Sequence, residues 1–141
     1  MRALITATFL SSFFILMIGC GQSSTDSEVS STEGAFLKHI SAQEFKTQME
    51  TQPGILLDVR TPGEFASGHL KNATLIDFNG DNFSAEISRQ KDKDQVYYVY
   101  CGSGIRSARA AELMKSKGFT KIYDMKGGIA QWQRAGFEVT K

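Results

Sequence analysis

Two short runs of mostly apolar residues, at positions 55–59 and 96–100, limit the folds open to this chain more than any other feature. Apolar residues at consecutive positions are typical of strands that are buried on both faces, as in parallel sheets. Strand patterns alternate with helical patterns throughout residues 36–141. This alternation predicts an α/β fold with a mainly parallel sheet, in which ligands bind beyond the carboxyl ends of the strands.

The boundaries of these elements follow from turn and capping residues. We expect strands at residues 36–40, 55–59, 73–76, 96–100 and 122–124. We expect helices at residues 41–50, from Thr61 to about Gly68, at 82–90, at 107–117 and from Gly128 to about Gly136. Ser41 and Glu44 have the spacing of a capping box, and Thr61-Pro62 is typical of a helix start. Trp132, at helical spacing from Gly128, is predicted to pack in the core.

Cys101 stands where the strand at 96–100 gives way to an alanine-rich helix. Unpaired backbone N–H groups and the helix dipole favour an anion at such a position, and a thiolate is an anion. Gly102 and Gly104 allow the intervening backbone to curl with its amides pointing inward. Arg106 is a cation at a helix start, where the dipole disfavours it, and a bound anion would explain its position. The pattern predicts a nucleophilic thiol at Cys101.

Other cysteine chemistry is excluded by counting. The chain has two cysteines, Cys20 and Cys101, and two histidines, His39 and His69, and their spacing does not fit a zinc site. It contains no CxxC motif, which argues against a thioredoxin-like dithiol. We therefore expect neither a metal nor a cofactor.

The first 19 residues have the pattern of a signal peptide: a basic start, an apolar stretch too short to span a membrane, and Met17-Ile18-Gly19-Cys20. The last four residues resemble the lipobox of bacterial lipoproteins, although leucine is usual where Met17 stands. This resemblance implies cleavage before Cys20, lipid on that residue, and a location on the periplasmic side of a membrane. Gly21 favours the outer membrane. The alternative is an ordinary secretory signal with a chance cysteine.

Residues 20–35 are rich in serine and threonine and are predicted to form a flexible tether. Residues 36–141 are enough for one domain with a single core. The chain carries a formal net charge of only +1, with no basic run, which argues against a nucleic-acid partner.

Several motifs, taken in their order along residues 36–141, resemble a single-domain rhodanese. They are Asp58-Val59-Arg60, Glu64-Phe65, Gly68-His69-Leu70, Ala73, Cys101-x-x-Gly104-x-Arg106-Ser107 and Gly127-Gly128 followed by Trp132 and Gly136. The resemblance implies the rhodanese-like fold, a mainly parallel sheet of about five strands with helices on both faces. It also implies a rhodanese-type (thiosulfate) sulfurtransferase.

In that family the cysteine takes a sulfane sulfur from a donor such as thiosulfate and passes it, as a persulfide, to cyanide or a thiol. The resemblance assigns this role to Cys101, with Gly102, Ser103, Gly104 and Ile105 as the persulfide-binding loop. The planar fork of Arg106 would hold the sulfonate end of thiosulfate. Related phosphatases have one residue more between cysteine and arginine, so the four residues present here favour sulfur over phosphate. Arg109 would either extend the positively charged entrance to the Cys101 site or lie solvated at the surface.

Asp58, Arg60 and Glu64 match the family's framework beside the active site. We expect Asp58 and Glu64 to orient loop residues or Arg106, or else to belong to a structural ion-pair network. His69 is expected to be a packed, hydrogen-bonded residue and not a general base. The chain departs from the family at Leu75-Ile76-Asp77, where Asn-Ile-Pro is frequent, which places the choice of donor in doubt more than the activity.

Two other functions fit the same residues. The domain would act as a persulfide carrier that exchanges sulfur with a relay protein, with an exposed Ile105 suiting such a partner. Alternatively, the domain would be a catalytically inactive rhodanese-like binding module. The presence of both Cys101 and Arg106 argues against this alternative.

Overall fold

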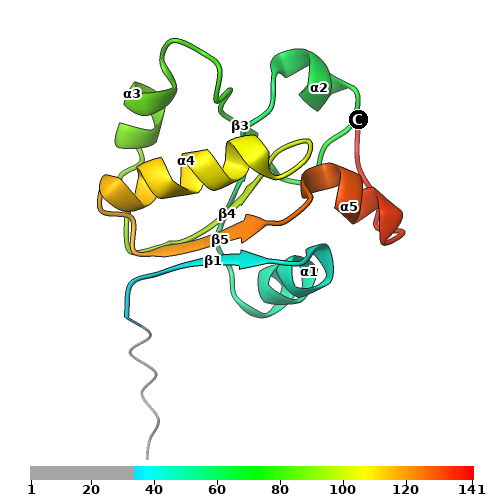
Figure 1. The fold of residues 1–141 in the computed structure, drawn as a ribbon, viewed down its shortest axis with the longest axis horizontal. Helices are drawn as coiled ribbons and strands as arrows, with labels where there is room; N and C mark the ends of the chain where they lie inside the picture. Colours follow the sequence, from blue (N-terminus) through cyan, green and yellow to red (C-terminus); the bar gives the residue numbers. More distant parts are fainter. Residues whose placement is uncertain (1–33) are drawn as a thin grey trace, which may run out of the picture. The chain divides into compact units, whose positions relative to one another are not determined.

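The computed structural model describes residues 34–141, which form a five-stranded sheet with helices around it (Figure 1). The strands are β1 (Phe36–Ile40), β2 (Ile55–Asp58), β3 (Thr74–Leu75), β4 (Val96–Tyr100) and β5 (Lys121–Met125). Their order in the sheet is β1-β5-β4-β2-β3, and every neighbouring pair is parallel. The predicted parallel sheet is confirmed, with β4 at its centre.

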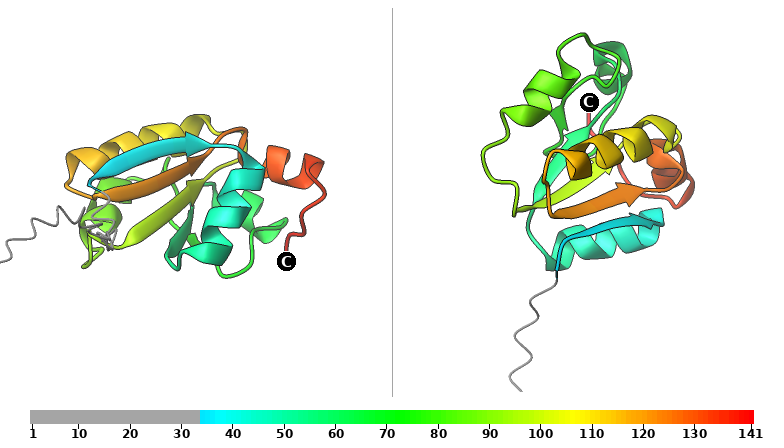
Figure 2. Two further views of the ribbon diagram at one scale, coloured as in Figure 1. Left: turned by 90° about the horizontal axis from the view of Figure 1, so that it is seen from below. Right: turned by 60° about the vertical axis from the view of Figure 1, so that its left-hand side comes forward.

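Helices cover both faces of this sheet, as predicted (Figure 2). They are α1 (Ala42–Thr51), α2 (Pro62–Ala66), α3 (Phe83–Ser88), α4 (Ile105–Ser116) and α5 (Gly128–Arg134). Buried residues of α3 and α4 form one core cluster with the sheet, and those of α1 and α5 form the second. The two clusters lie on opposite faces because successive side chains of a strand point to opposite sides.

Strand β4 shows why its sequence is apolar at every position. All five of its residues are buried. Tyr97 and Val99 belong to the cluster under α3 and α4, while Tyr98 and Tyr100 belong to the cluster under α1 and α5. Burial of each large side chain contributes about 1.5–3 kcal/mol. The strand is thereby fixed in the middle of the protein, and Cys101 follows it directly.

Two helix starts are set by capping boxes. The Ser41 hydroxyl accepts from the Glu44 N–H, and the Glu44 carboxylate accepts from the Ser41 N–H, at the start of α1. Thr61 and Glu64 make the same reciprocal bonds at the start of α2, where Pro62 takes the first helical position. The Ser41 capping box and the Thr61-Pro62 start are as the sequence predicted. The reciprocal bond from Glu64 also holds that carboxylate at the start of α2.

Some boundaries differ from the predicted ones. Helix α4 begins at Ile105, two residues before the expected start, because Gly104 takes the left-handed conformation and acts as the cap. Strand β3 is only two residues long. The predicted signal peptide, the lipidated Cys20 and most of the tether lie outside the described residues. Within residues 34–141 no helix has the length and apolar character needed to cross a membrane.

Candidate functional site

Cys101 lies at the carboxyl end of the central strand, where its side chain is fully buried. The chain then turns back over the sulfur before α4 begins. The backbone N–H of Gly104 donates a hydrogen bond to the Cys101 Sγ, with an N–S distance of 3.1 Å. A backbone amide is therefore directed at the sulfur, and it would stabilise negative charge there.

The loop can close this tightly because of one glycine in particular. Gly104 has a φ of +92°, and a Cβ placed on it would lie 2.8 Å from the backbone nitrogen of Gly127. Gly102, in contrast, is not among the residues with positive φ. A Cβ on Gly102 would approach the Arg106 Nη2 to 3.3 Å, so that position is restricted by a neighbouring side chain. Of the two glycines, Gly104 is thus needed for its left-handed backbone, whereas Gly102 leaves room for the Arg106 side chain.

The N-terminus of α5 holds the loop from outside. The N–H of Ile129 donates to the Cys101 carbonyl at 2.8 Å, and the N–H of Ala130 donates to the Gly102 carbonyl at 3.2 Å. In a trans peptide the N–H points opposite to the C=O. The amides that follow these two carbonyls, those of Gly102 and Ser103, are thus turned away from α5.

This support was missed in the sequence analysis. Gly128 packs directly on the loop, because a Cβ on it would lie 2.2 Å from the Cys101 carbonyl oxygen. Gly127 and Gly128 both have positive φ. The adjacent glycines were the available signal, but nothing in the sequence indicated that they contact Cys101.

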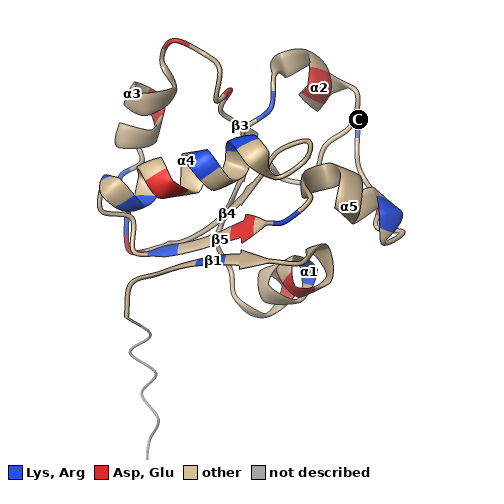
Figure 3. Ribbon diagram, in the orientation of Figure 1, with Lys and Arg blue, Asp and Glu red and all other residues tan. Residues whose placement is uncertain are grey.

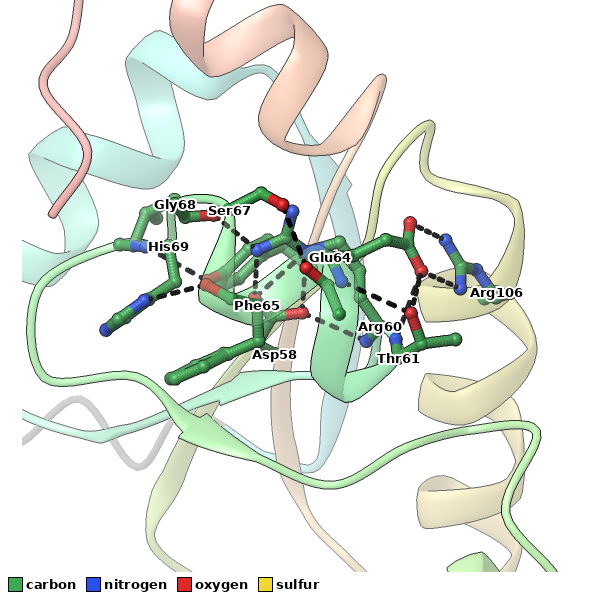
Figure 4. Close-up of polar contacts among 12 residues, drawn as sticks. Asp58, Arg60, Thr61, Glu64, Phe65, Ser67, Gly68, His69 and Arg106 are labelled. Carbon is green, nitrogen blue, oxygen red and sulfur yellow. Dashed lines mark hydrogen bonds and ion pairs between the residues drawn. The ribbon is translucent and has the colours of Figure 1, made fainter. Parts of the chain in front are cut away.

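Glu64 and Arg106 form a two-point ion pair beside the loop (Figure 4). Arg106 Nη1 donates to Glu64 Oε2 at 2.8 Å, and Nη2 donates to Oε1 at 2.6 Å. The arginine comes from the first turn of α4 and the glutamate from α2, where the Thr61 cap also holds it. Hydrogen bonding to Arg106, with that to Thr61, lowers the pKa of Glu64 to about 2.

Arg106 also interacts with the cysteine. Its pKa is raised above the ordinary arginine value, first by the hydrogen bonds to Glu64 and the charge of that carboxylate, with a smaller electrostatic contribution from Cys101. The guanidinium is therefore bonded to the Glu64 carboxylate and lies near enough to Cys101 to interact with it. It is placed to stabilise charge that develops at Cys101.

Asp58 and Arg60 form a separate, buried pair. Arg60 Nη2 donates to Asp58 Oδ2 at 2.6 Å, and its Nε donates to Asp58 Oδ1 at 2.9 Å. Arg60 Nη2 also donates to the Gly68 carbonyl, so the pair ties the end of β2 to the segment after α2 (Figure 4). Of the two carboxylates expected to orient Arg106 or the loop, Glu64 bonds Arg106, whereas Asp58 bonds Arg60.

The two histidines form their hydrogen bonds with groups other than the Cys101 sulfur. The His69 ring stacks on Phe65 at a centroid distance of 3.7 Å, and its Nδ1 lies 3.1 Å from the Phe65 carbonyl. His39 Nδ1 lies 2.6 Å from the buried Asp124 carboxylate. Trp132 is buried in the cluster under α1 and α5. These contacts agree with packing roles for His69 and Trp132.

An open groove of about 580 Å³ borders the cysteine loop. It is lined by His39, Ser103, Gly104, Ile105, Ala108, Arg109, Asp124, Lys126 and Gly127. Ile105 is 64% exposed and is the single exposed large apolar residue within positions 34–141. Figure 3 shows basic residues on α4 and on the segment that follows β5. Nowhere in those positions do three or more potential metal ligands gather.

The fold and the site together define an α/β protein whose cysteine is enclosed in a short loop between the central strand and a helix. The family model for the rhodanese-like domain matches residues 41–135, and the chain belongs to this family.

Known relatives agree with the assignment. The chain is 32% identical over 99 residues to the uncharacterized protein YqhL of Bacillus subtilis, covering 68% of this chain and 72% of the relative. It is 30% identical over 106 residues to the tRNA uridine(34) hydroxylase of Cronobacter sakazakii, covering 72% of this chain. The chain spans only 30% of the length of that hydroxylase.

Solved structures show the same fold. A rhodanese-like domain protein from Staphylococcus aureus superposes with a TM-score of 0.62 at 31% identity, covering 74% of this chain and 99% of that one. The rhodanese-like domain of an Anabaena protein gives a TM-score of 0.64 at 26% identity, covering 72% and 77%.

Proposed function

We propose that this rhodanese-like domain is a sulfurtransferase that carries a sulfane sulfur on Cys101. The Cys101 thiolate attacks the outer sulfur of a donor such as thiosulfate, the S–S bond of the donor breaks, and sulfite leaves. The new persulfide then gives its terminal sulfur to cyanide or a thiol, which regenerates the thiolate. No cofactor is needed for either step.

The observation that carries this proposal is the surroundings of the sulfur. The Gly104 amide is bonded to Sγ and the Arg106 guanidinium interacts with it. Both groups favour an anionic sulfur, which is what attacks in the first step and what the persulfide presents in the second. The bonds from α5 keep these groups in position before a donor arrives.

The proposed activity is tested by thiocyanate production from thiosulfate and cyanide, with the Cys101→Ser variant as the control. Turnover by the wild type that is lost in the variant supports the enzyme. Turnover that persists in the variant contradicts it.

A second candidate function, a persulfide carrier for a relay protein, is favoured by the exposed Ile105. This residue lies in the groove that shares Ser103 and Gly104 with the cysteine loop. A single exposed apolar residue is common on protein surfaces, so this candidate rests on the position of Ile105 directly beside the cysteine loop. A carrier would gain one sulfur on Cys101, seen by intact mass, but would turn over small acceptors slowly.

Several relatives are named as tRNA uridine(34) hydroxylases, but this chain corresponds to a minor part of them. Its formal net charge of +1 provides little attraction to a tRNA backbone. We therefore propose sulfur transfer, and not tRNA hydroxylation, for this chain.

We further propose that the domain acts outside the cytoplasm, anchored by lipid on Cys20, with the outer membrane favoured. The proposal rests on the pattern of residues 1–20. Cell fractionation of the wild type and a Cys20→Ala variant tests it. The wild type should be found with membranes and the variant should not; equal distribution would contradict the anchor.

A further inference from the structure

The guanidinium of Arg106 is largely committed to Glu64. Two of its five N–H donors are used by the carboxylate, at 2.6 and 2.8 Å, which leaves three. The side chains are only 25% and 37% exposed, so solvent screens the pair incompletely. Any ligand that approaches Arg106 therefore meets the negative charge of Glu64 as well.

The charges of the groups around the Cys101 sulfur disfavour the binding of a doubly negative donor. The Glu64 carboxylate is negative, a Cys101 thiolate adds a second negative charge, and Arg106, which is bonded to Glu64, balances only one of the two. Thiosulfate would bring two further negative charges next to Glu64. The reacting S–S end of a thiol persulfide brings at most one, and its leaving group is a thiolate with no oxygens to be held. Like charges in a partly dry site are costly, so the second donor is favoured.

We infer that Glu64 sets the choice of donor, and that the preferred donor is a thiol persulfide and not thiosulfate; this rests on the proposed sulfur transfer. In the first step the Cys101 thiolate attacks the outer sulfur of R–S–SH. The S–S bond of the donor breaks, R–S⁻ leaves, and Cys101 becomes the persulfide. The step needs no oxidant or reductant. Arg106 stabilises the sulfur anion, and Glu64 lowers the attraction of Arg106 for oxyanions.

The test uses Glu64→Gln in the full chain, purified in detergent. The glutamine side chain keeps an oxygen that can accept from the Thr61 N–H, so the cap of α2 is retained while the negative charge is removed. Glu44→Gln is a matched control, since Glu44 is the equivalent capping-box residue of α1 and bonds Ser41, not Arg106. The two donors are thiosulfate and glutathione persulfide.

The measured quantity is kcat/KM for each donor at low and high salt. In the wild type, glutathione persulfide should be the better donor. Glu64→Gln should raise the ratio of thiosulfate to glutathione persulfide by about tenfold, through a lower KM for thiosulfate that rises again with salt. Glu44→Gln should leave the ratio as in the wild type.

An unchanged ratio in Glu64→Gln would overturn the inference, as would an equal fall for both donors, which would make Glu64 a positioning residue for Arg106. The inference is also overturned if kcat/KM of the wild type is equal for thiosulfate and glutathione persulfide. If no donor loads sulfur on Cys101 in any of the three proteins, the proposed function itself fails. That outcome differs from the others because no ratio can then be measured.

Discussion

Gly128 presses its backbone against the carbonyl of Cys101, so closely that a Cβ on Gly128 would lie 2.2 Å from that oxygen. The contact is made next to the bond from the Ile129 N–H to the same carbonyl. The cysteine loop is therefore shaped by two segments that are distant in the sequence. Its form depends on α5 as much as on its own glycines.

Gly128→Ala should push the loop away from α5 and reduce both stability and sulfur loading. Gly136→Ala is the control, because Gly136 also has positive φ but has open space around its Cβ position. The control should lose about 1–2 kcal/mol from backbone strain alone and keep its activity. Urea denaturation and intact-mass loading of Cys101 measure the two effects. Equal losses of stability in the two variants, with loading retained, would contradict the role of Gly128.

Arg106→Ala should lower kcat/KM for any sulfane donor by an amount equivalent to about 2–4 kcal/mol. The variant loses the cation beside Cys101 and leaves the Glu64 charge unbalanced. Arg134→Ala, at an exposed position near the end of α5, is a control for loss of one positive charge. Steady-state kinetics with glutathione persulfide measure the effect. A rate like that of Arg134→Ala would remove Arg106 from the site.

The stabilising effect of the Glu64–Arg106 ion pair should decrease in acid. The folded protein lowers the pKa of Glu64 from 4.5 to about 2, so the carboxylate stabilises the fold fully above about pH 4.5. This contribution is lost as the pH falls from 4.5 towards 2. The free energy of unfolding of the wild type should thus fall more steeply with acid than that of Glu64→Gln. Denaturant titrations at pH 6, 4 and 3 measure the difference, and parallel curves would show that the pair adds nothing.

Asp58→Ala should destabilise the protein by about 3–5 kcal/mol, because it leaves the buried Arg60 charge without its partner. Glu50→Ala is the contrast, since it removes one member of an exposed pair with Lys46 and should cost well under 1 kcal/mol. Urea denaturation at neutral pH compares them. Similar small losses would mean that the Asp58–Arg60 pair is not structural.

Most of the helices and strands could be predicted from patterns of residues that are close together in the sequence. The run at β4 and the Ser41–Glu44 capping box depend on neighbours within a few residues, and both are present as expected. The alanine-rich pattern predicted a helix from Ser107, but the Ser107 hydroxyl donates to the Gly104 carbonyl inside the first turn of α4. The left-handed Gly104 decided the boundary, and a sequence does not report its φ.

The contacts that shape the site could not be predicted in the same way. Glu64 and Arg106 are 42 residues apart and meet only because α2 and α4 lie at the same end of the sheet. Gly128 reaches Cys101 because β5 is the neighbour of β4 in the sheet. The order of the strands, which sets both contacts, was not deducible from alternating patterns. The sequence motifs identified the residues of the site, but the residues that contact them are determined by the order of the strands in the sheet.

The most direct test of the account is the intact mass of the full chain, with Cys20 changed to serine, after incubation with glutathione persulfide and removal of the donor. Cys101 should gain one sulfur atom and lose it again on addition of cyanide, with thiocyanate formed in equal amount. The matched protein with Cys101→Ser should gain none. A wild-type loop that never gains sulfur, or a serine variant that gains as much, would contradict a persulfide on Cys101.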